Sequence, residues 1–218
     1  MSADASDPAA FASQPISQLL IKVATRCNID CSYCYWFRDA AVYDKPKLMS
    51  AEVLQQLLLR IEEHITEHGL VDLPIILHGG EPLLWGVENF SHFAEACAAI
   101  SSRTGSAIPI AVTTNGVLID DRWLDCFEAH DISVAISIDG PAHIHDLHRR
   151  TFQGGGTHAA VERAARLLVS RDIRGRMSRT GADLSEGDAV GATKVYFRRG
   201  GFRRGGSAFR RGGFVKGY

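Results

Sequence analysis

The sequence predicts an α/β fold, with a parallel sheet of about four strand–helix units that is open or curls toward a barrel. Short apolar segments alternate four times with longer segments of helical periodicity. These apolar segments are nearly continuous, as parallel strands buried on both faces tend to be. The length of 218 residues suits one sizeable domain with an appendage. The alternation of strand and helix implies right-handed crossover connections.

Four segments rich in β-branched and other apolar residues are the expected strands. They are residues 19–23, 74–77, 109–113 and 132–137. A helical pattern follows each of them, so we expect the four strands to run parallel and to end at one edge of the sheet.

Helical periodicity fills the intervals between these strands. Ser50 is expected to cap a helix that stops at Gly69. A second apolar stripe covers residues 90–100, a shorter helix follows Asp120, and Thr157 is expected to cap a fourth helix. The predicted buried face of the first helix comprises Val53, Leu54, Leu57, Leu58, Ile61 and Ile65.

The net charge of −1 conceals two segments of opposite sign. Residues 1–172 hold 13 Lys/Arg against 22 Asp/Glu, whereas residues 173–218 hold 11 against 3. Residues 1–15 are small and polar, are expected to be disordered, and lack the basic start and apolar stretch of a secretory signal. No apolar run reaches the ~18 residues of a membrane span. These features argue against a membrane protein and favour the cytoplasm.

Three cysteines follow the first strand with the spacing C-x3-C-x2-C, at Cys27, Cys31 and Cys34. Three thiolates can hold three corners of a [4Fe–4S] cube and leave the fourth iron open to a small molecule. Structural zinc usually takes four ligands in paired motifs, and only one C-x2-C pair is present. Five cysteines without a secretory signal also make a disulfide framework a poor alternative. Cys97 and Cys126 fall on apolar helical stripes and are expected to be buried core thiols.

Polar motifs also follow the other three strands. Residues 78–82 read His-Gly-Gly-Glu-Pro, residues 114–116 read Thr-Asn-Gly, and residues 137–141 read Ser-Ile-Asp-Gly-Pro. Because ligands of parallel α/β sheets bind at the carboxyl ends of the strands, these motifs are expected to surround the cysteine loop.

Together these motifs resemble the radical S-adenosylmethionine (SAM) superfamily over residues 16–170. The resemblance is greatest to peptide maturases that carry a C-terminal SPASM domain, and residues 34–37 with 43–45 look like the subgroup that makes cyclophane crosslinks in ribosomal peptides. The resemblance implies a [4Fe–4S] cluster, SAM, and an electron donor such as flavodoxin or ferredoxin. The implied activity is formation of a 5′-deoxyadenosyl radical that abstracts hydrogen from a peptide side chain.

The resemblance also assigns the site residues. Cys27, Cys31 and Cys34 would hold the cluster and serve catalysis. The Gly79-Gly80-Glu81 motif would bind the amino group of SAM, and Tyr33 would lie against its adenine. The remaining SAM contacts implied are Asn115, Ser137, Asp139 and Arg149.

Two of these assignments have alternatives in the sequence itself. Arg149 would meet the SAM carboxylate with its guanidinium fork, but Arg150 beside it is an equally basic candidate. Asn115, with Thr114 before it, could simply form a turn after a strand. Histidines near these motifs, such as His78, are expected to pack or hydrogen-bond rather than to bind metal.

The chain is expected to hold an incomplete form of the family's core. That core has about six strand–helix units in a barrel, and four are visible in residues 16–172. No cysteine follows Cys126, so auxiliary clusters of a SPASM domain are not expected in this chain. The edge of the fourth strand would be exposed, which predicts a weakened fold.

Residues 173–218 are expected to be a disordered tail, since 11 of the 46 residues are glycine. Phe-Arg-Arg-Gly-Gly occurs three times in it, starting at Phe197, Phe202 and Phe209. Three origins stay open: an RNA-binding Arg/Gly segment, a damaged gene end, or a precursor-like peptide substrate. The last would pair Phe197/Arg199, Phe202/Arg204, Phe209/Arg211 and Phe214/Lys216.

Two functional interpretations follow. The first is a radical SAM enzyme fragment that modifies peptides. The second is a catalytically inactive truncated or fusion product whose tail is a peptide substrate or binds RNA.

Overall fold

The computed structural model describes residues 15–35, 40–171 and 193–197, the last as backbone only. The strands are β1 (Leu19–Ala24), β2 (Asp30–Cys31), β3 (Ile75–Gly79), β4 (Ile110–Thr114), β5 (Ser133–Ile138), β6 (Arg149–Arg150) and β7 (Thr193–Phe197). The helices are α2 (Ala51–His68), α3 (Val87–Thr104), α4 (Asp121–Ala129), α5 (Ala142–His148) and α6 (His158–Ser170), with 3-10 turns η2 (Ala40–Asp44) and η3 (Pro82–Trp85).

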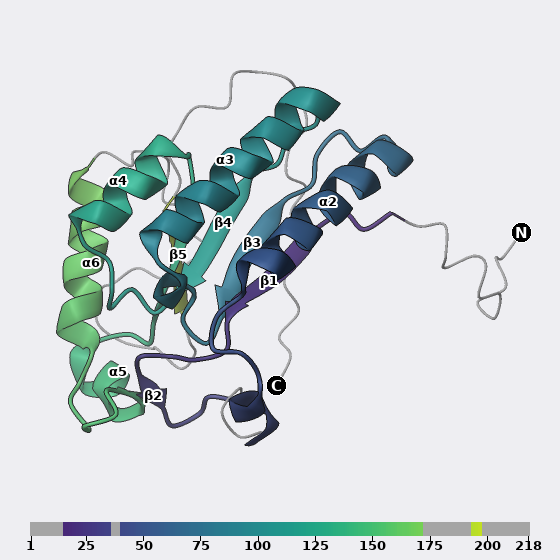
Figure 1. Ribbon diagram of the computed structural model, residues 1–218. Helices are drawn as coiled ribbons and strands as arrows, with labels where there is room; N and C mark the ends of the chain where they lie inside the picture. The colour runs from purple at the N-terminus through teal and green to yellow at the C-terminus, as the bar shows by residue number, and fades with distance from the viewer. Residues whose placement is uncertain (1–14, 36–39, 172–192, 198–218) are drawn as a thin grey trace, which may run out of the picture.

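The main sheet has the strand order β1-β3-β4-β5-β7, and its first four strands are parallel. The register pairs Leu19 with Ile75, and Ile75 with Ile110. All four strands point toward the end of the molecule that holds α5 and β2 (Figure 1). The predicted fold class and its four strand–helix units are therefore confirmed.

The first helix begins and ends where the sequence predicts. The Ser50 hydroxyl accepts a hydrogen bond from the Val53 amide at 3.3 Å, and Gly69 closes the helix in the left-handed conformation. Leu54 and Ile61 are buried on the sheet side, but Val53 is 54% exposed. The predicted apolar face was wrong at Val53, because the stripe that packs on the sheet is narrower than the run of apolar residues.

The core lies between one face of the sheet and the helices α2, α3, α4 and α6 (Figure 1). At its centre Phe90 meets Trp123 edge to face, with ring centroids 5.0 Å apart. Strand residues alternate in burial, because successive side chains point to opposite faces. Ile75 and Leu77 are fully buried, whereas Lys22 is exposed on the other face. The expectation that the strands are buried on both faces holds in the middle of β5, where Val134, Ala135 and Ile136 are all buried, but not in β1, β3 and β4.

β7 lies within the segment predicted to be disordered. It pairs antiparallel with β5, with Val134 opposite Phe197 and Ile138 opposite Thr193. Thr, Val, Tyr and Phe favour strands, and the edge of β5 offers unpaired backbone groups. The expected open edge is therefore paired at 193–197. The rest of the predicted tail, the N-terminal residues 1–14 and residues 36–39 lie outside the described residues.

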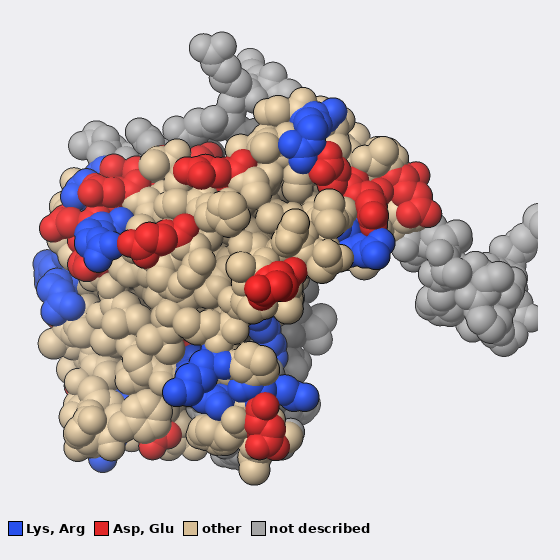
Figure 2. All heavy atoms as spheres, in the orientation of Figure 1, with Lys and Arg blue, Asp and Glu red and all other residues tan. Residues whose placement is uncertain are grey.

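Ion pairs tie the outer faces of the helices together. Arg103 of α3 contacts both carboxylate oxygens of Glu62 on α2 at 2.7 Å. Acidic and basic side chains intermingle over the upper part of the face seen in Figure 2, and below them a broad area without such side chains at the lower left adjoins a group of basic side chains at the lower right. None of the helices in the described part of the chain is long and apolar enough to cross a membrane.

Candidate functional site

Four loops meet at the edge where the parallel strands end (Figure 1). They are the cysteine loop after β1, the Gly-Gly-Glu turn after β3, the Thr-Asn-Gly turn after β4, and the segment from β5 into α5. The structure thus brings the predicted site residues to one place, because parallel strands all present their carboxyl ends there.

The cysteine loop is held in place by the segment that follows α5. β2 pairs antiparallel with β6, which sets Cys31 opposite Arg149. The Ser32 amide donates to the His148 carbonyl at 2.9 Å, and the Ser32 hydroxyl lies 2.9 Å from His148 Nδ1. All three loop cysteines, Cys27, Cys31 and Cys34, are half-buried free thiols. The loop therefore presents its thiols on a fixed backbone.

The root of the cysteine loop packs against the Gly-Gly turn. The Gly80 amide donates to the Ala24 carbonyl at 2.9 Å, and the Glu81 amide donates to the Arg26 carbonyl at 2.8 Å. A Cβ at Gly79 would collide with the Ala24 carbonyl, and a Cβ at Gly80 with that of Arg26. Glycine is required here for close approach to the chain's own backbone.

Glu81 is fully buried, and its carboxylate accepts three hydrogen bonds. The donors are the Leu83 amide at 3.0 Å, the Thr114 hydroxyl at 2.7 Å and the Asn115 amide at 2.8 Å. Burial raises the pKa of Glu81 to about 7, and these donors counteract that rise. The carboxylate thus ties the turn after β3 to the turn after β4, which differs from the expectation that it faces a ligand.

Asn115 connects this buried carboxylate to the cysteine loop. Its side-chain amide donates to Asn28 Oδ1 at 2.7 Å and lies 3.5 Å from Cys27 Sγ. Its side-chain carbonyl accepts from the Val117 amide at 3.0 Å. Because both ends of the amide are used, Asn115 is fixed with an N–H directed at a thiol.

A buried ion pair lies on the other side of the loop. Arg149 Nε donates to Asp139 Oδ2 at 3.0 Å, and the Tyr33 hydroxyl donates to the same oxygen. The guanidinium lies over the Tyr33 ring at 5.6 Å from its centroid, and Nη1 lies 4.0 Å from Cys31 Sγ. Within the described part of the chain, Asp139 Oδ1 is buried without a hydrogen-bond partner.

The structure also separates the two arginines that the sequence left ambiguous. Arg149 faces the cysteine loop, whereas Arg150 donates from Nε to the Asp146 carbonyl on the exposed side. Ser137 is half-buried near the end of β5, in register with Lys194 of β7. The site is therefore formed around Arg149, with Ser137 on an adjoining strand.

A profile of the radical SAM superfamily matches residues 21–182, which is most of the chain. The chain belongs to the radical SAM superfamily. It is 31% identical over 162 residues to the serine-type anaerobic sulfatase-maturating enzyme of Bacteroides thetaiotaomicron, covering 73% of this chain and 38% of that protein. It is 32% identical over 156 residues to the cysteine-type enzyme of Clostridium perfringens, covering 71% of this chain and 41% of that protein.

A solved structure supports the same relationship. The structure described as native anSMEcpe with bound AdoMet and Cp18Cys peptide is 30% identical to this chain with a TM-score of 0.61. The match covers 72% of this chain and 40% of the other. This radical SAM chain thus spans about two fifths of the length of the relatives it matches.

The donor set of this radical SAM chain fits an iron–sulfur cluster. Three thiols lie on one loop, and an amide and a guanidinium approach two of the sulfurs. Among the residues that the structure describes, no three His, Cys, Asp or Glu side chains converge on a single-ion site. A cube of four irons spreads its ligands more widely than one ion does, so a cluster does not require the three thiols to converge on one point.

Burial favours the protonated form of the Cys27 and Cys31 thiols when they are without iron. It raises the pKa of Cys27 to about 12 and that of Cys31 to about 11. The Asn115 amide lowers the first, and the Arg149 charge lowers the second. Metal coordination deprotonates a thiol outright, and these two neighbours favour the same charged form.

Some residues of the site were not identified from the sequence. Asn28 contacts Asn115, and the Thr157 hydroxyl donates to the Arg149 carbonyl. Asn28 directly follows Cys27, and this position beside a motif cysteine could have indicated that it belongs to the site. Thr157 was assigned only a helix cap, and nothing in its local sequence indicates that its hydroxyl bonds elsewhere.

Proposed function

We propose that this chain is a radical SAM enzyme domain that holds a [4Fe–4S] cluster on Cys27, Cys31 and Cys34 and binds SAM beside it. The convergence of three half-buried thiols with polar groups from three other strand ends is the main support. When bound, the reduced cluster supplies the electron that splits SAM into methionine and a 5′-deoxyadenosyl radical. We place the chain in the cytoplasm, with flavodoxin or ferredoxin as electron donor.

The ion pair beside the loop suits the polar groups of SAM. Arg149 uses Nε for Asp139, and its Nη1 faces Cys31, where it can meet a carboxylate bound next to the cluster. The buried Asp139 Oδ1 can accept a hydrogen bond from a ligand N–H or O–H. The exposed part of the Tyr33 ring offers a surface for the adenine. Ser137, near the end of β5, is the remaining SAM contact that we propose.

The Gly-Gly-Glu turn acts through its backbone in this proposal. The oxygens of Glu81 are engaged by three donors inside the protein, so the contact with the amino group of SAM falls to the backbone of Gly79 and Gly80. Glu81 then holds that turn beside Asn115. A Glu81 variant would disturb SAM binding by moving the turn.

We propose a peptide as the substrate, since the similar proteins are sulfatase-maturating enzymes and one solved relative holds a peptide. A finer proposal is a crosslink between an aromatic ring and the third residue of an aromatic-x-Arg/Lys triplet. Such triplets occur in this chain's own tail, and apart from Phe197 they lie outside the described residues. A crosslink would remove two hydrogens, one as the atom taken by the 5′-deoxyadenosyl radical and one as a proton whose electron would return to the oxidised cluster, and intact mass spectrometry would detect the loss.

The direct test is formation of 5′-deoxyadenosine. The full chain would be reconstituted with iron and sulfide without oxygen, then given SAM and a strong reductant. We expect product from the wild type and from Cys97→Ala, and none from Cys31→Ala. Product in the Cys31→Ala chain, or none from a wild-type chain that holds a cluster, would contradict the proposal.

A further inference from the structure

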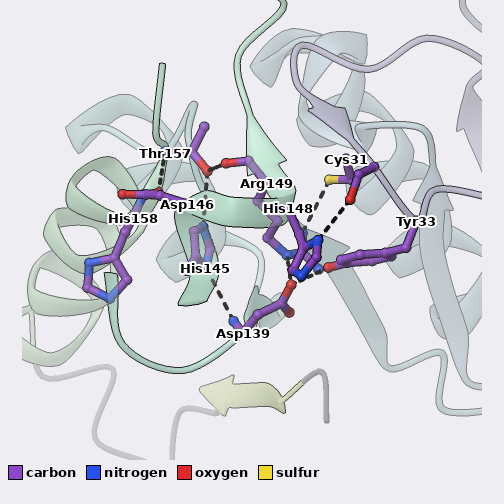
Figure 3. A network of polar contacts seen from close by, with 10 residues as sticks. Cys31, Tyr33, Asp139, His145, Asp146, His148, Arg149, Thr157 and His158 are labelled. Carbon is purple, nitrogen blue, oxygen red and sulfur yellow. Dashed lines mark hydrogen bonds and ion pairs between the residues drawn. The ribbon is translucent and has the colours of Figure 1, made fainter. Parts of the chain in front are cut away.

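His145 lies fully buried between the two residues of the ion pair. It belongs to α5, which separates Asp139 at the end of β5 from Arg149 in β6. Its Nδ1 lies 3.2 Å from the Asp139 amide nitrogen, and its Nε2 lies 3.0 Å from the Thr157 hydroxyl (Figure 3). One ring thus joins the strand end to the start of α6.

The direction of each hydrogen bond follows from the partners. The Asp139 amide can only donate, so Nδ1 of His145 must accept and carry no proton. The neutral ring then carries its proton on Nε2 and donates it to the Thr157 hydroxyl. That hydroxyl donates in turn to the Arg149 carbonyl at 2.8 Å. The chain of bonds runs in one direction from Asp139 to Arg149.

Both ends of this chain are backbone groups of the ion pair. The amide belongs to Asp139 and the carbonyl to Arg149, and the side chains of the same two residues meet at 3.0 Å. This relay of hydrogen bonds through His145 and Thr157 therefore sets the distance between the two backbone segments from which the carboxylate and the guanidinium project. Moving either end would shift the ion pair.

The start of α6 is arranged to leave the Thr157 hydroxyl available. Thr157 is the N-cap residue, yet its side chain makes no capping bond. Asp146 takes that role from α5, because its Oδ1 accepts from the amides of Thr157 and His158 at 2.8 Å each. Two adjacent residues thus have separate roles: Asp146 caps α6, and His145 holds the backbone that carries the ion pair.

The same segment holds the cysteine loop. Arg149 pairs with Cys31 across β2 and β6, and His148 contacts Ser32. A shift of the Arg149 backbone would therefore reach the second cysteine as well as the guanidinium. This connects the relay to the position of both proposed ligands, the cluster and the carboxylate of SAM.

The surroundings of the ring favour its neutral form. Burial lowers the pKa of His145, and the nearby Arg149 charge lowers it further. A charged ring would also direct a second N–H at the Asp139 amide, where no acceptor lies.

We propose that His145 is a positioning residue: as the neutral Nε2–H tautomer between Asp139 and Thr157, it fixes the Asp139–Arg149 pair beside the cysteine loop. The consequence for SAM affinity rests on the proposed function, whereas the tautomer and the ion pair do not.

The first test is NMR of the full chain without cluster or SAM. The ¹⁵N shifts of His145 should show Nε2 protonated and Nδ1 as an acceptor. Hydrogen exchange at Arg149 Nε–H, which reports the ion pair, should be slow. An Nδ1–H tautomer or a doubly protonated ring at neutral pH would overturn the proposal, whether or not the chain cleaves SAM.

Matched variants separate positioning from packing. Thr157→Val keeps the shape but loses the hydroxyl, and Thr157→Ser keeps the hydroxyl. Exchange at Arg149 Nε–H should rise about tenfold in Thr157→Val and His145→Phe, and stay near wild type in Thr157→Ser and in His143→Asn on the exposed side of α5. Equal exchange in Thr157→Val and Thr157→Ser would overturn the proposal.

SAM affinity of the reconstituted chain adds a readout at the site. We expect Thr157→Val to weaken SAM binding about tenfold, with Thr157→Ser within about twofold of wild type. Intact NMR signatures with no SAM cleavage by the wild type would contradict the proposed function alone. Wild-type SAM affinity in Thr157→Val would overturn the positioning role.

Discussion

The five cysteines of the chain lie in two contrasting regions. Cys27 and its two loop partners are half-buried, and an amide and a guanidinium group approach the sulfurs of Cys27 and Cys31. Cys97 on α3 and Cys126 on α4 are buried in the apolar core, where Cys126 lies 3.5 Å from the Ser91 hydroxyl. Burial raises the pKa of Cys97 to about 12, as it does for Cys27. The raised pKa values of Cys27 and Cys97 therefore do not distinguish the regions, whereas the amide and guanidinium groups beside Cys27 and Cys31 do.

The largest effect should come from removing cysteines from each region. Alanine at Cys27, Cys31 or Cys34 should lower bound iron from about four atoms per chain to nearly none. Alanine at Cys97 should keep the iron and lower the free energy of unfolding by about 1 kcal/mol. Iron analysis and denaturant unfolding measure the two effects. Iron loss in the Cys97 variant would remove the contrast between the regions.

The core should respond to a lost side chain by unfolding more easily. Phe90 is fully buried and stacks edge to face on Trp123. Phe90→Ala should lower the free energy of unfolding by about 3–5 kcal/mol, measured by denaturant titration. The cluster spectrum of the chain that remains folded should be unchanged. A changed spectrum would mean that the core and the cysteine loop are not separable.

Glu81 should make stability depend on pH. Its pKa is raised by burial from 4.5 to about 7, so the folded chain holds the proton more tightly than the unfolded chain does. The contribution of Glu81 to stability should be greatest below about pH 4.5 and fall as pH rises to about 7, by up to roughly 3 kcal/mol. Unfolding of apo protein across this range should show the slope, and Glu81→Gln should flatten it. An equal slope in both chains would assign it to other groups.

The smallest effect should come from removing a helix cap. Ser50→Ala removes the cap of α2 and should lower the free energy of unfolding by about 1 kcal/mol. Iron content and SAM affinity should match the wild type, because the Ser50 hydroxyl bonds the Val53 amide of its own helix rather than a residue of the cysteine loop. Ser50→Asp, which can still cap, is the control. A loss of iron in Ser50→Ala would mean that the stability of α2 and the iron site of the cysteine loop are not independent.

The fold was predictable where the pattern is local. Alternating apolar segments placed the four parallel strands to within about two residues, and Ser50 and Gly69 bounded α2, whereas α5 was not predicted. The structure of the loops was harder to predict, because their contacts join residues that are far apart in the sequence. Glu81 was expected to face a ligand, but its partners Thr114 and Asn115 come from the next strand end, which no local pattern specifies.

Non-local pairing also explains why the structure differs from the sequence-based expectations at β7 and at Thr157. The composition of residues 173–218 favours disorder, yet the edge of β5 accepts the short run from Thr193 to Phe197. Thr157 marks a helix start correctly, but its hydroxyl is engaged by His145 and Arg149. Each depends on a partner that only the folded chain brings near.

The central claim is that the three loop cysteines leave one iron of a cluster open for SAM. Mössbauer spectroscopy of the full chain reconstituted with ⁵⁷Fe, with and without SAM, tests it directly. We predict that about one quarter of the iron changes its signal when SAM is added, while the remainder does not. A Mössbauer signal that SAM leaves unchanged for all four irons, or a chain that retains no iron–sulfur cluster, would contradict the account.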